Sequence, residues 1–137
     1  MVMKAVGWIF LFWMSMAVSA EEGGSGSAVP YVDLAPSFVT NFGGSSAGDT
    51  PHYVKVDVSL RVASNDIADE VKYHAPALRN YLLLLFTAQN QQTMTTPQGQ
   101  EFLRQQALKG INALLLREDG PKVQVQNVFF TSFVVQQ

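Results

Sequence analysis

The segment from Val54 to Val62 alternates strictly between apolar and polar side chains. Valine or leucine takes every second position, and charged or hydroxyl side chains take the positions between them. Successive side chains of a strand point to opposite faces, so this pattern predicts a strand with one buried and one solvated face. The charges at Lys55, Asp57 and Arg61 are interpreted as its solvated surface.

Extended structure is also predicted before this strand. Residues 31–34 favour a short strand, which the residues after Pro36 extend toward Phe42. Residues 43–51 are rich in glycine, serine, aspartate and proline, which are the residues that turns prefer. They predict a solvated connection between two antiparallel strands.

Helical spacing of apolar residues replaces the alternation in the middle of the chain, over residues 65–117. Asn65 or Asp66 can cap a first helix that begins at Ile67, because either side chain can accept a hydrogen bond from an unpaired N–H of the first turn. Pro76 lacks an N–H and clashes with the preceding turn. It therefore predicts either a kink or a new helix with Pro76 in its first turn.

Apolar residues nearly surround the helix that follows Pro76. Leu78, Leu82, Leu85 and Phe86 share one face, and two further leucines widen it. A helix of this kind is either buried in the core or in contact with a partner. The residues assigned to a candidate subunit contact are Leu82, Leu83, Leu84 and Phe86.

A second amphipathic helix is predicted after the polar stretch at residues 89–93. Thr96 can cap it, Pro97 suits its first position, and Gly120 and Pro121 end it. Apolar residues then fill both alternating sets between Val123 and Val135, which favours a central strand buried on both faces. Strands on both sides of a helical block indicate an α+β fold, with an antiparallel or mixed sheet and helices packed on it.

Residues 1–20 have the layout of a secretory signal. One positive charge, Lys4, precedes an uncharged apolar run that ends in small residues. Cleavage after Ala20 is expected, and residues 21–30, rich in glycine and serine, then form a flexible linker. The alternative is a short membrane anchor, although the run from Ala5 to Ala20 is shorter than the ~20 residues that a spanning helix needs.

Composition excludes several classes of protein. The chain has 137 residues with a net charge of −2, and its basic residues are scattered, so no nucleic-acid partner is expected. The absence of cysteine excludes a disulfide scaffold and a thiolate metal site. With 47% hydrophobic and 15% charged residues, the chain is too apolar to be intrinsically disordered.

No pattern of catalytic or metal-ligating residues emerges. Neither His52 nor His74 has a ligand-like neighbour two, three or four residues after it, and no nucleotide or serine-hydrolase motif occurs. The acidic cluster of Asp66, Asp69 and Glu70 is explained by the capping and dipole of a helix start. The sequence therefore predicts no enzyme activity, no metal site and no cofactor.

The second half of the chain carries an ordered set of short motifs. They are Ala77-Leu-Arg-Asn80, Thr95-Thr-Pro-Gln-Gly-Gln-Glu-Phe-Leu-Arg104, Gly110-Ile-Asn112 and Asn127-Val-Phe-Phe-Thr-Ser-Phe-Val-Val-Gln136. In this order and spacing they resemble the flagellar basal-body-associated FliL family. The resemblance extends upstream through Tyr31-Val-Asp-Leu34, Asn41 and the strand at 53–62, so residues 31–137 are identified as a FliL-like periplasmic domain.

The resemblance implies a fold similar to the stomatin and prohibitin (SPFH) domains and no catalytic residues. It implies an accessory protein of the flagellar basal body that associates with the motor stator as a homo-oligomer and supports swimming or swarming. Its location would be the periplasm, or the periplasmic face of the inner membrane if the leader is retained.

The leader differs from the family pattern of a basic cytoplasmic tail followed by a full-length spanning helix. Only three residues precede Lys4, and the apolar run is short. A cleaved chain would have no anchor. The alternative is therefore a soluble periplasmic scaffolding or binding module that keeps the fold without a flagellar role.

Overall fold

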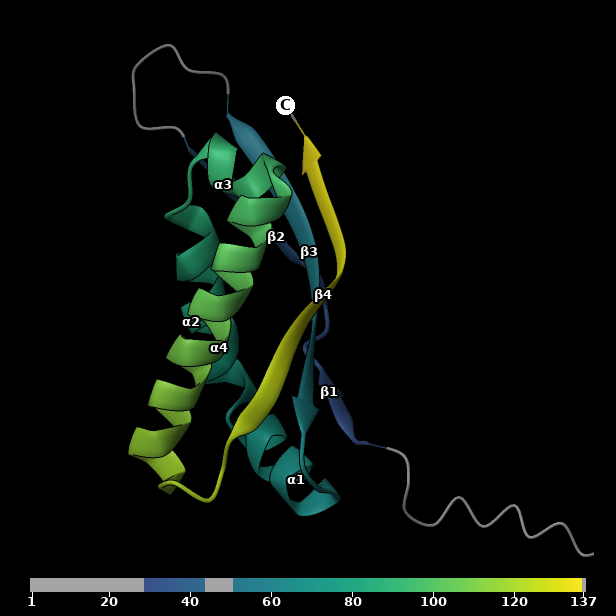
Figure 1. The fold of residues 1–137 in the computed structure, drawn as a ribbon, viewed down its shortest axis with the longest axis vertical. Helices are drawn as coiled ribbons and strands as arrows, with labels where there is room; N and C mark the ends of the chain where they lie inside the picture. Colours follow the sequence, from purple (N-terminus) through teal and green to yellow (C-terminus); the bar gives the residue numbers. More distant parts are fainter. Residues whose placement is uncertain (1–28, 44–50, 137) are drawn as a thin grey trace, which may run out of the picture.

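The alternating segment forms the centre of a four-stranded antiparallel sheet (Figure 1). In the computed structural model, which describes residues 29–43 and 51–136, this strand is β3 (His52–Val62). Two short strands, β1 (Tyr31–Asp33) and β2 (Phe38–Phe42), pair with one edge of β3, and β4 (Val125–Gln136) pairs with the other. The mixed α+β class with an antiparallel sheet is confirmed.

β1 and β2 lie one after the other along the same edge of β3. Val32 pairs with Leu60 near the end of β3, and Thr40 pairs with Val54 near its start. The extended segment is interrupted between them, where a cis peptide bond precedes Pro36. Proline has no N–H to donate to a sheet, so the single extended segment predicted from the sequence is two strands in the structure.

The first helix, α1 (Asn65–Tyr73), begins two residues earlier than predicted. The cap is Ser64, whose Oγ accepts a hydrogen bond from the N–H of Ile67 at 3.3 Å. The assignment of the cap to Asn65 or Asp66 was therefore wrong, since both are already helical. Of the two outcomes predicted for Pro76, the structure has the second, because α2 (Ala75–Thr87) is a new helix with this proline in its first turn.

A short helix, α3 (Gln91–Thr95), occupies part of the polar stretch that separates the long helices. The side chain of Asn90 caps it, and Met94 anchors it in the core. The cap of α4 (Pro97–Asp119) is confirmed, since Thr96 Oγ1 accepts from the N–H of Gly99 at 3.0 Å. The helix ends at Gly120, which has φ of +78°, a conformation that favours glycine.

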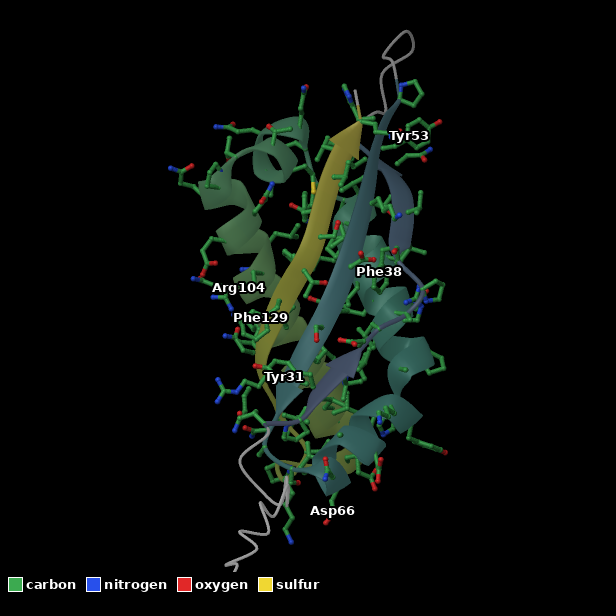
Figure 2. All side chains as sticks on the ribbon, turned by 90° about the vertical axis from the view of Figure 1, so that its right-hand side faces the viewer. Tyr31, Phe38, Tyr53, Asp66, Arg104 and Phe129 are labelled. Carbon is green, nitrogen blue, oxygen red and sulfur yellow. The ribbon has the colours of Figure 1, made fainter. Side chains whose placement is uncertain are left out.

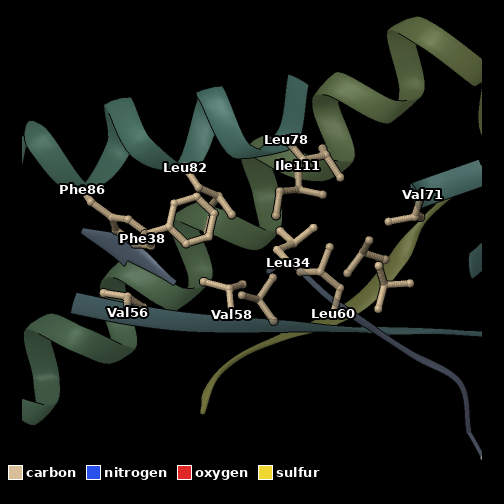
Figure 3. Packing of buried hydrophobic residues seen from close by; sticks show 14 of the residues in the cluster. Leu34, Phe38, Val56, Val58, Leu60, Val71, Leu78, Leu82, Phe86 and Ile111 are labelled. Carbon is tan, nitrogen blue, oxygen red and sulfur yellow. The ribbon is translucent and has the colours of Figure 1, made fainter. Parts of the chain in front are cut away.

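The core lies between one face of the sheet and the layer formed by α2 and α4 (Figures 1 and 3). Figure 3 shows Leu78, Leu82 and Phe86 of α2 pointing toward the apolar side chains of β3. Ile111 of α4 completes this layer. Burial of each such side chain contributes about 1.5–3 kcal/mol, so this interface contributes strongly to the stability of the fold.

β4 is an edge strand, so the prediction of a central strand buried on both faces was wrong. Among the described strands it pairs only with β3, and two residues of β4, Gln126 and Thr131, are passed over in the pairing at register shifts. Each bulge reverses which alternate positions face the helices. The residues of β4 on the covered side are consequently Val125, Val128, Phe130, Phe133 and Val135.

Candidate interaction surface

Arg79 connects the segment between β1 and β2 to α2. Its Nη1 donates to the carbonyl oxygens of Leu34 at 2.9 Å and Pro36 at 2.7 Å. Its guanidinium also lies 4.2 Å from the centre of the Phe38 ring, a cation–π contact. The arginine of the Ala77–Asn80 motif thus holds the segment between β1 and β2 against the helix layer.

Gly110 and Gly99 allow close approaches of the helices. A Cβ at Gly110 would overlap with the hydroxyl of Tyr81, which donates to the carbonyl oxygen of Gln106 at 3.2 Å. A Cβ at Gly99 would overlap with the backbone of Thr93 in α3. Burial raises the pKa of Tyr81, as expected for a phenol inserted between two helices.

Asn112 joins α4 to the start of β4. Its side chain donates to the carbonyl oxygen of Val125 at 3.0 Å and accepts from the N–H of the same residue at 2.8 Å. This amide satisfies both backbone groups of Val125, which would otherwise lack partners at the end of the sheet.

A second connection between α4 and β4 contains Glu101, Arg104 and Asn127. Arg104 donates to both carboxylate oxygens of Glu101, at 2.8 and 2.6 Å, and to the side chain of Asn127. Hydrogen bonds from Arg104 and Gln105 lower the pKa of Glu101 to about 2. The same pair raises the pKa of Arg104. Arg104 therefore connects α4 to β4 through Asn127.

The four residues assigned to a subunit contact divide into two pairs. Leu82 and Phe86 are fully buried in the core, whereas Leu83 and Leu84 are 38% and 61% exposed. A contact on α2 can therefore use only the second pair, which we call the exposed leucine pair. Ala20, the expected cleavage site, lies outside the described residues.

The sheet face turned away from the helices is the second exposed surface, which we call the open sheet face (Figure 2). At one end of β3, the exposed apolar side chains of Val39, Tyr53 and Val134 lie around Lys55. At the other end, the rings of Tyr31 and Phe129 lie 6.1 Å apart. Between the two ends is a pocket of about 500 Å³ whose lining includes two carboxylates, Asp33 and Asp57.

Both carboxylates of this pocket have hydroxyl partners. Ser59 donates to Asp33 at 2.7 Å, and Ser37 donates to Asp57. Ser59 lies directly between Asp33 of β1 and Phe129 of β4 in the pairing of the three strands, whereas Tyr31 pairs with Arg61. The rings of Tyr31 and Phe129 therefore approach each other diagonally across β3.

The histidines occupy different parts of the fold. His52 begins β3, next to the ring of Phe42. His74 lies between α1 and α2, and its Nε2 is 2.6 Å from an oxygen of Asp119. Glu70 lies near the same pair. Glu70 precedes His74 by four residues, so it does not appear among the neighbours that follow each histidine, and this spacing is the sequence signal for the cluster.

Comparison with known proteins identifies the family. The profile described as "Flagellar basal body-associated protein FliL" matches residues 31–136. The chain belongs to the FliL family. The family assignment made from the four motifs is thereby confirmed, and the residues of those motifs that anchor helix to strand lie within the match.

Two relatives named "Flagellar protein FliL" illustrate the range of similarity. The protein of Aquifex aeolicus is 32% identical over 103 residues, which are 75% of this chain and 59% of that protein. The protein of Escherichia coli strain K12 is 23% identical over 129 residues, which are 93% of this chain and 80% of that protein. The match therefore spans less than two thirds of the Aquifex FliL protein.

A FliL-family chain is associated with the flagellar basal body, as the family description states. Within residues 29–43 and 51–136, no helix has the length and apolar character needed to cross a membrane. The apolar run at residues 1–20 lies outside these ranges.

Proposed function

We propose that this protein is a non-enzymatic accessory component of the flagellar basal body that associates with the motor stator and supports swimming or swarming. The observation that carries the proposal is the family match over residues 31–136. The roles of the motif residues support it. Arg79 and Asn112 hold helices to the strand layer, and Gly110 lets α2 and α4 approach closely, which are the roles of a scaffold.

The domain acts in the periplasm, or on the periplasmic face of the inner membrane at the basal body. The signal-like pattern of residues 1–20 supports this location. The α+β arrangement, with helices on one face of an antiparallel sheet, is compatible with the SPFH-like fold that the resemblance implies.

The mass and the tryptophan fluorescence of the purified chain together measure whether the leader is retained. Both tryptophans of the sequence, Trp8 and Trp13, lie before Ala20. A cleaved product therefore has no tryptophan fluorescence and begins at Glu21. A retained leader preserves the fluorescence and places the protein at the inner membrane.

The stator association is tested by photo-crosslinking in cells of the source bacterium. A photoreactive amino acid replaces Leu84 of the exposed leucine pair or Val134 of the open sheet face, and Asp66, an exposed residue of α1, is the control position. Stator or basal-body proteins captured at Leu84 or Val134, and not at Asp66, support the proposal. Capture of soluble periplasmic proteins alone would mean that the fold serves a different role.

The homo-oligomer is proposed to use the exposed leucine pair. The two adjacent leucines on the exposed side of α2 lose water when a second copy covers them, and this burial favours association. Leu84→Glu is expected to dissociate the oligomer in sedimentation experiments while the circular dichroism spectrum stays unchanged.

Leu116→Glu is the matched control, because Leu116 is also an exposed helix leucine, at 54%. Leu84 is in the last turn of α2 and Leu116 in the last turn of α4, and these helices run in opposite directions (Figure 1). The two leucines thus lie at opposite ends of the helix layer. Dissociation by both substitutions, or unfolding by Leu84→Glu, would contradict a contact at the exposed leucine pair.

A further inference from the structure

Three side chains from two helices and the turn between α1 and α2 meet at the end of the domain where α1 and the C-terminus of α4 lie together. They are Glu70 of α1, His74 at the α1–α2 junction and Asp119, the last residue of α4. One nitrogen or oxygen atom from each lies within 4.8 Å of the other two. Glu70 and His74 are four residues apart, which brings their side chains to the same face of the helix end.

Two atoms of this cluster are buried without a hydrogen bond. Nε2 of His74 and Oδ2 of Asp119 are shielded from solvent and 2.6 Å apart, yet their orientation does not form a hydrogen bond. In the described part of the chain they have no other partner. A buried polar atom without a partner is costly, and a cation bound between the two atoms would satisfy both.

The electrostatic surroundings favour a cation. Glu70 is in the last turn of α1 and Asp119 is at the end of α4, where the helix dipole is negative and disfavours a carboxylate. In the parts of the chain described above, neither carboxylate forms an ion pair with lysine or arginine. Two carboxylates and a neutral imidazole carry a charge of −2, which one divalent cation neutralises.

We infer that Glu70, His74 and Asp119 form a binding site for a divalent transition-metal ion of the zinc type. A histidine nitrogen with two carboxylate oxygens suits Zn²⁺, whereas Mg²⁺ and Ca²⁺ prefer oxygen ligands alone. Three protein ligands leave the fourth tetrahedral position to water. To bind one ion, the two closest ligand atoms separate from 2.6 Å to roughly 3.3 Å, the spacing of tetrahedral ligands about 2.0 Å from zinc.

Such an ion would connect the α1–α2 junction to the end of α4. The bound state would then resist separation of the two helices, because metal binding to the folded chain alone adds to its stability. The competing arrangement is a protonated His74 paired with Asp119. This arrangement supplies one positive charge and needs no metal.

The test is isothermal titration of ZnCl₂ into the full chain, purified without a polyhistidine tag and freed of metal with EDTA. The expected result is one zinc ion per chain and a rise in the thermal unfolding midpoint, with little response to Mg²⁺. Glu70→Gln, a substitution of an exposed residue, is expected to weaken zinc binding about tenfold or more. His74→Gln is expected to abolish it.

Two control variants are matched to these substitutions. His52→Gln removes the other histidine of the chain, and Asp69→Asn removes a neighbouring charge from α1. Both are expected to bind zinc as the unaltered chain does. The inference is overturned if zinc at about 1 mM, a weak affinity by any standard, produces neither heat nor a thermal shift. Undiminished binding to Glu70→Gln and His74→Gln, or equal binding of Mg²⁺, would also overturn it.

Discussion

The two faces of the sheet use the same four strands but have different surroundings. On the covered face, Val56, Val58 and Leu60 of β3 are packed beneath α2 and α4 and are almost inaccessible to solvent. On the open sheet face, Asp57 of β3 accepts a hydrogen bond from Ser37 and Ser59 donates one to Asp33. The rings of Tyr31 and Phe129 lie on the same face (Figure 2). Packing therefore determines the residues of the covered face, whereas the residues of the open sheet face are available for other molecules.

The helix layer has the same division. Leu82 and Leu84 are two residues apart on α2, yet one is fully buried and the other is 61% exposed. The difference arises because a helix turns by about 100° per residue, so two positions two residues apart face in nearly opposite directions. Apolar character alone therefore does not show whether a leucine of α2 lies in the core or on the exposed side of the helix.

The substitution with the largest expected effect on stability directly tests the division of α2 into a buried and an exposed side. Leu82→Ala is expected to lower the free energy of unfolding by about 2–5 kcal/mol, because it removes buried methyl groups and leaves a cavity. Leu84→Ala, the same substitution on the exposed side of the same helix, is expected to change it by less than about 0.5 kcal/mol. Urea denaturation followed by circular dichroism measures both. Protein concentration is kept low so that self-association does not contribute.

Equal losses of stability in the two alanine variants would mean that Leu84 is buried in solution. This outcome would remove the basis for a subunit contact at the exposed leucine pair.

The second effect concerns the connection between the helix layer and β4. Asn112→Ala is expected to cost about 1–3 kcal/mol, because both backbone groups of Val125 lose their partner. Asn80→Ala is the matched control, since Asn80 is an exposed asparagine of the other long helix. It is expected to change the free energy of unfolding by less than about 0.5 kcal/mol. Urea denaturation at pH 7 distinguishes them.

Hydrogen exchange sharpens this test. In Asn112→Ala the amide protons at the start of β4 are expected to exchange faster than those of β3, since the strand end loses its attachment to α4. A uniform increase of exchange over the whole sheet would contradict a local role for Asn112.

The sequence predicted the central strand well because one of its faces is continuously covered, and an uninterrupted cover preserves the alternation at Val54–Val62. It also predicted the Thr96 cap, and it gave the new helix at Pro76 as one of two outcomes, because both features depend on local backbone chemistry. β4 was predicted wrongly for a physical reason. The bulges at Gln126 and Thr131 arise from its pairing with β3, and no local pattern marks them.

The residues that connect helices to strands show a similar limit of prediction from sequence. The motifs that contain Arg79 and Asn112 can be read in the sequence, but the partners of these two side chains lie 45 and 13 residues away. The cluster of Glu70, His74 and Asp119 depends in the same way on where α4 ends relative to α1. Only the packing of the helices brings these groups together.

The smallest expected effect concerns the network that joins α4 to the edge of the sheet. The pKa of Glu101 is about 2, chiefly because Arg104 donates hydrogen bonds to its carboxylate. A carboxyl group whose pKa is lower in the folded state than its usual 4.5 contributes stability above that value. The contribution is lost as the pH falls from 4.5 toward 2, and it is small because the Glu101 side chain is 52% exposed and solvent screens the pair.

Titration by nuclear magnetic resonance of the Glu101 carboxyl group measures this directly. A midpoint near 2 is expected in the unaltered chain, and Arg104→Met is expected to return it toward 4.5, because the hydrogen bonds are gone. The thermal unfolding midpoint of Glu101→Gln should fall slightly below that of the unaltered chain at pH 7 and coincide with it near pH 2. Glu118→Gln, which removes a carboxylate from the other end of α4, controls for the loss of one negative charge. A midpoint near 4.5 in the unaltered chain would show that the pair of Glu101 and Arg104 is open in solution, and that Glu101 does not contribute to the attachment of α4 to β4.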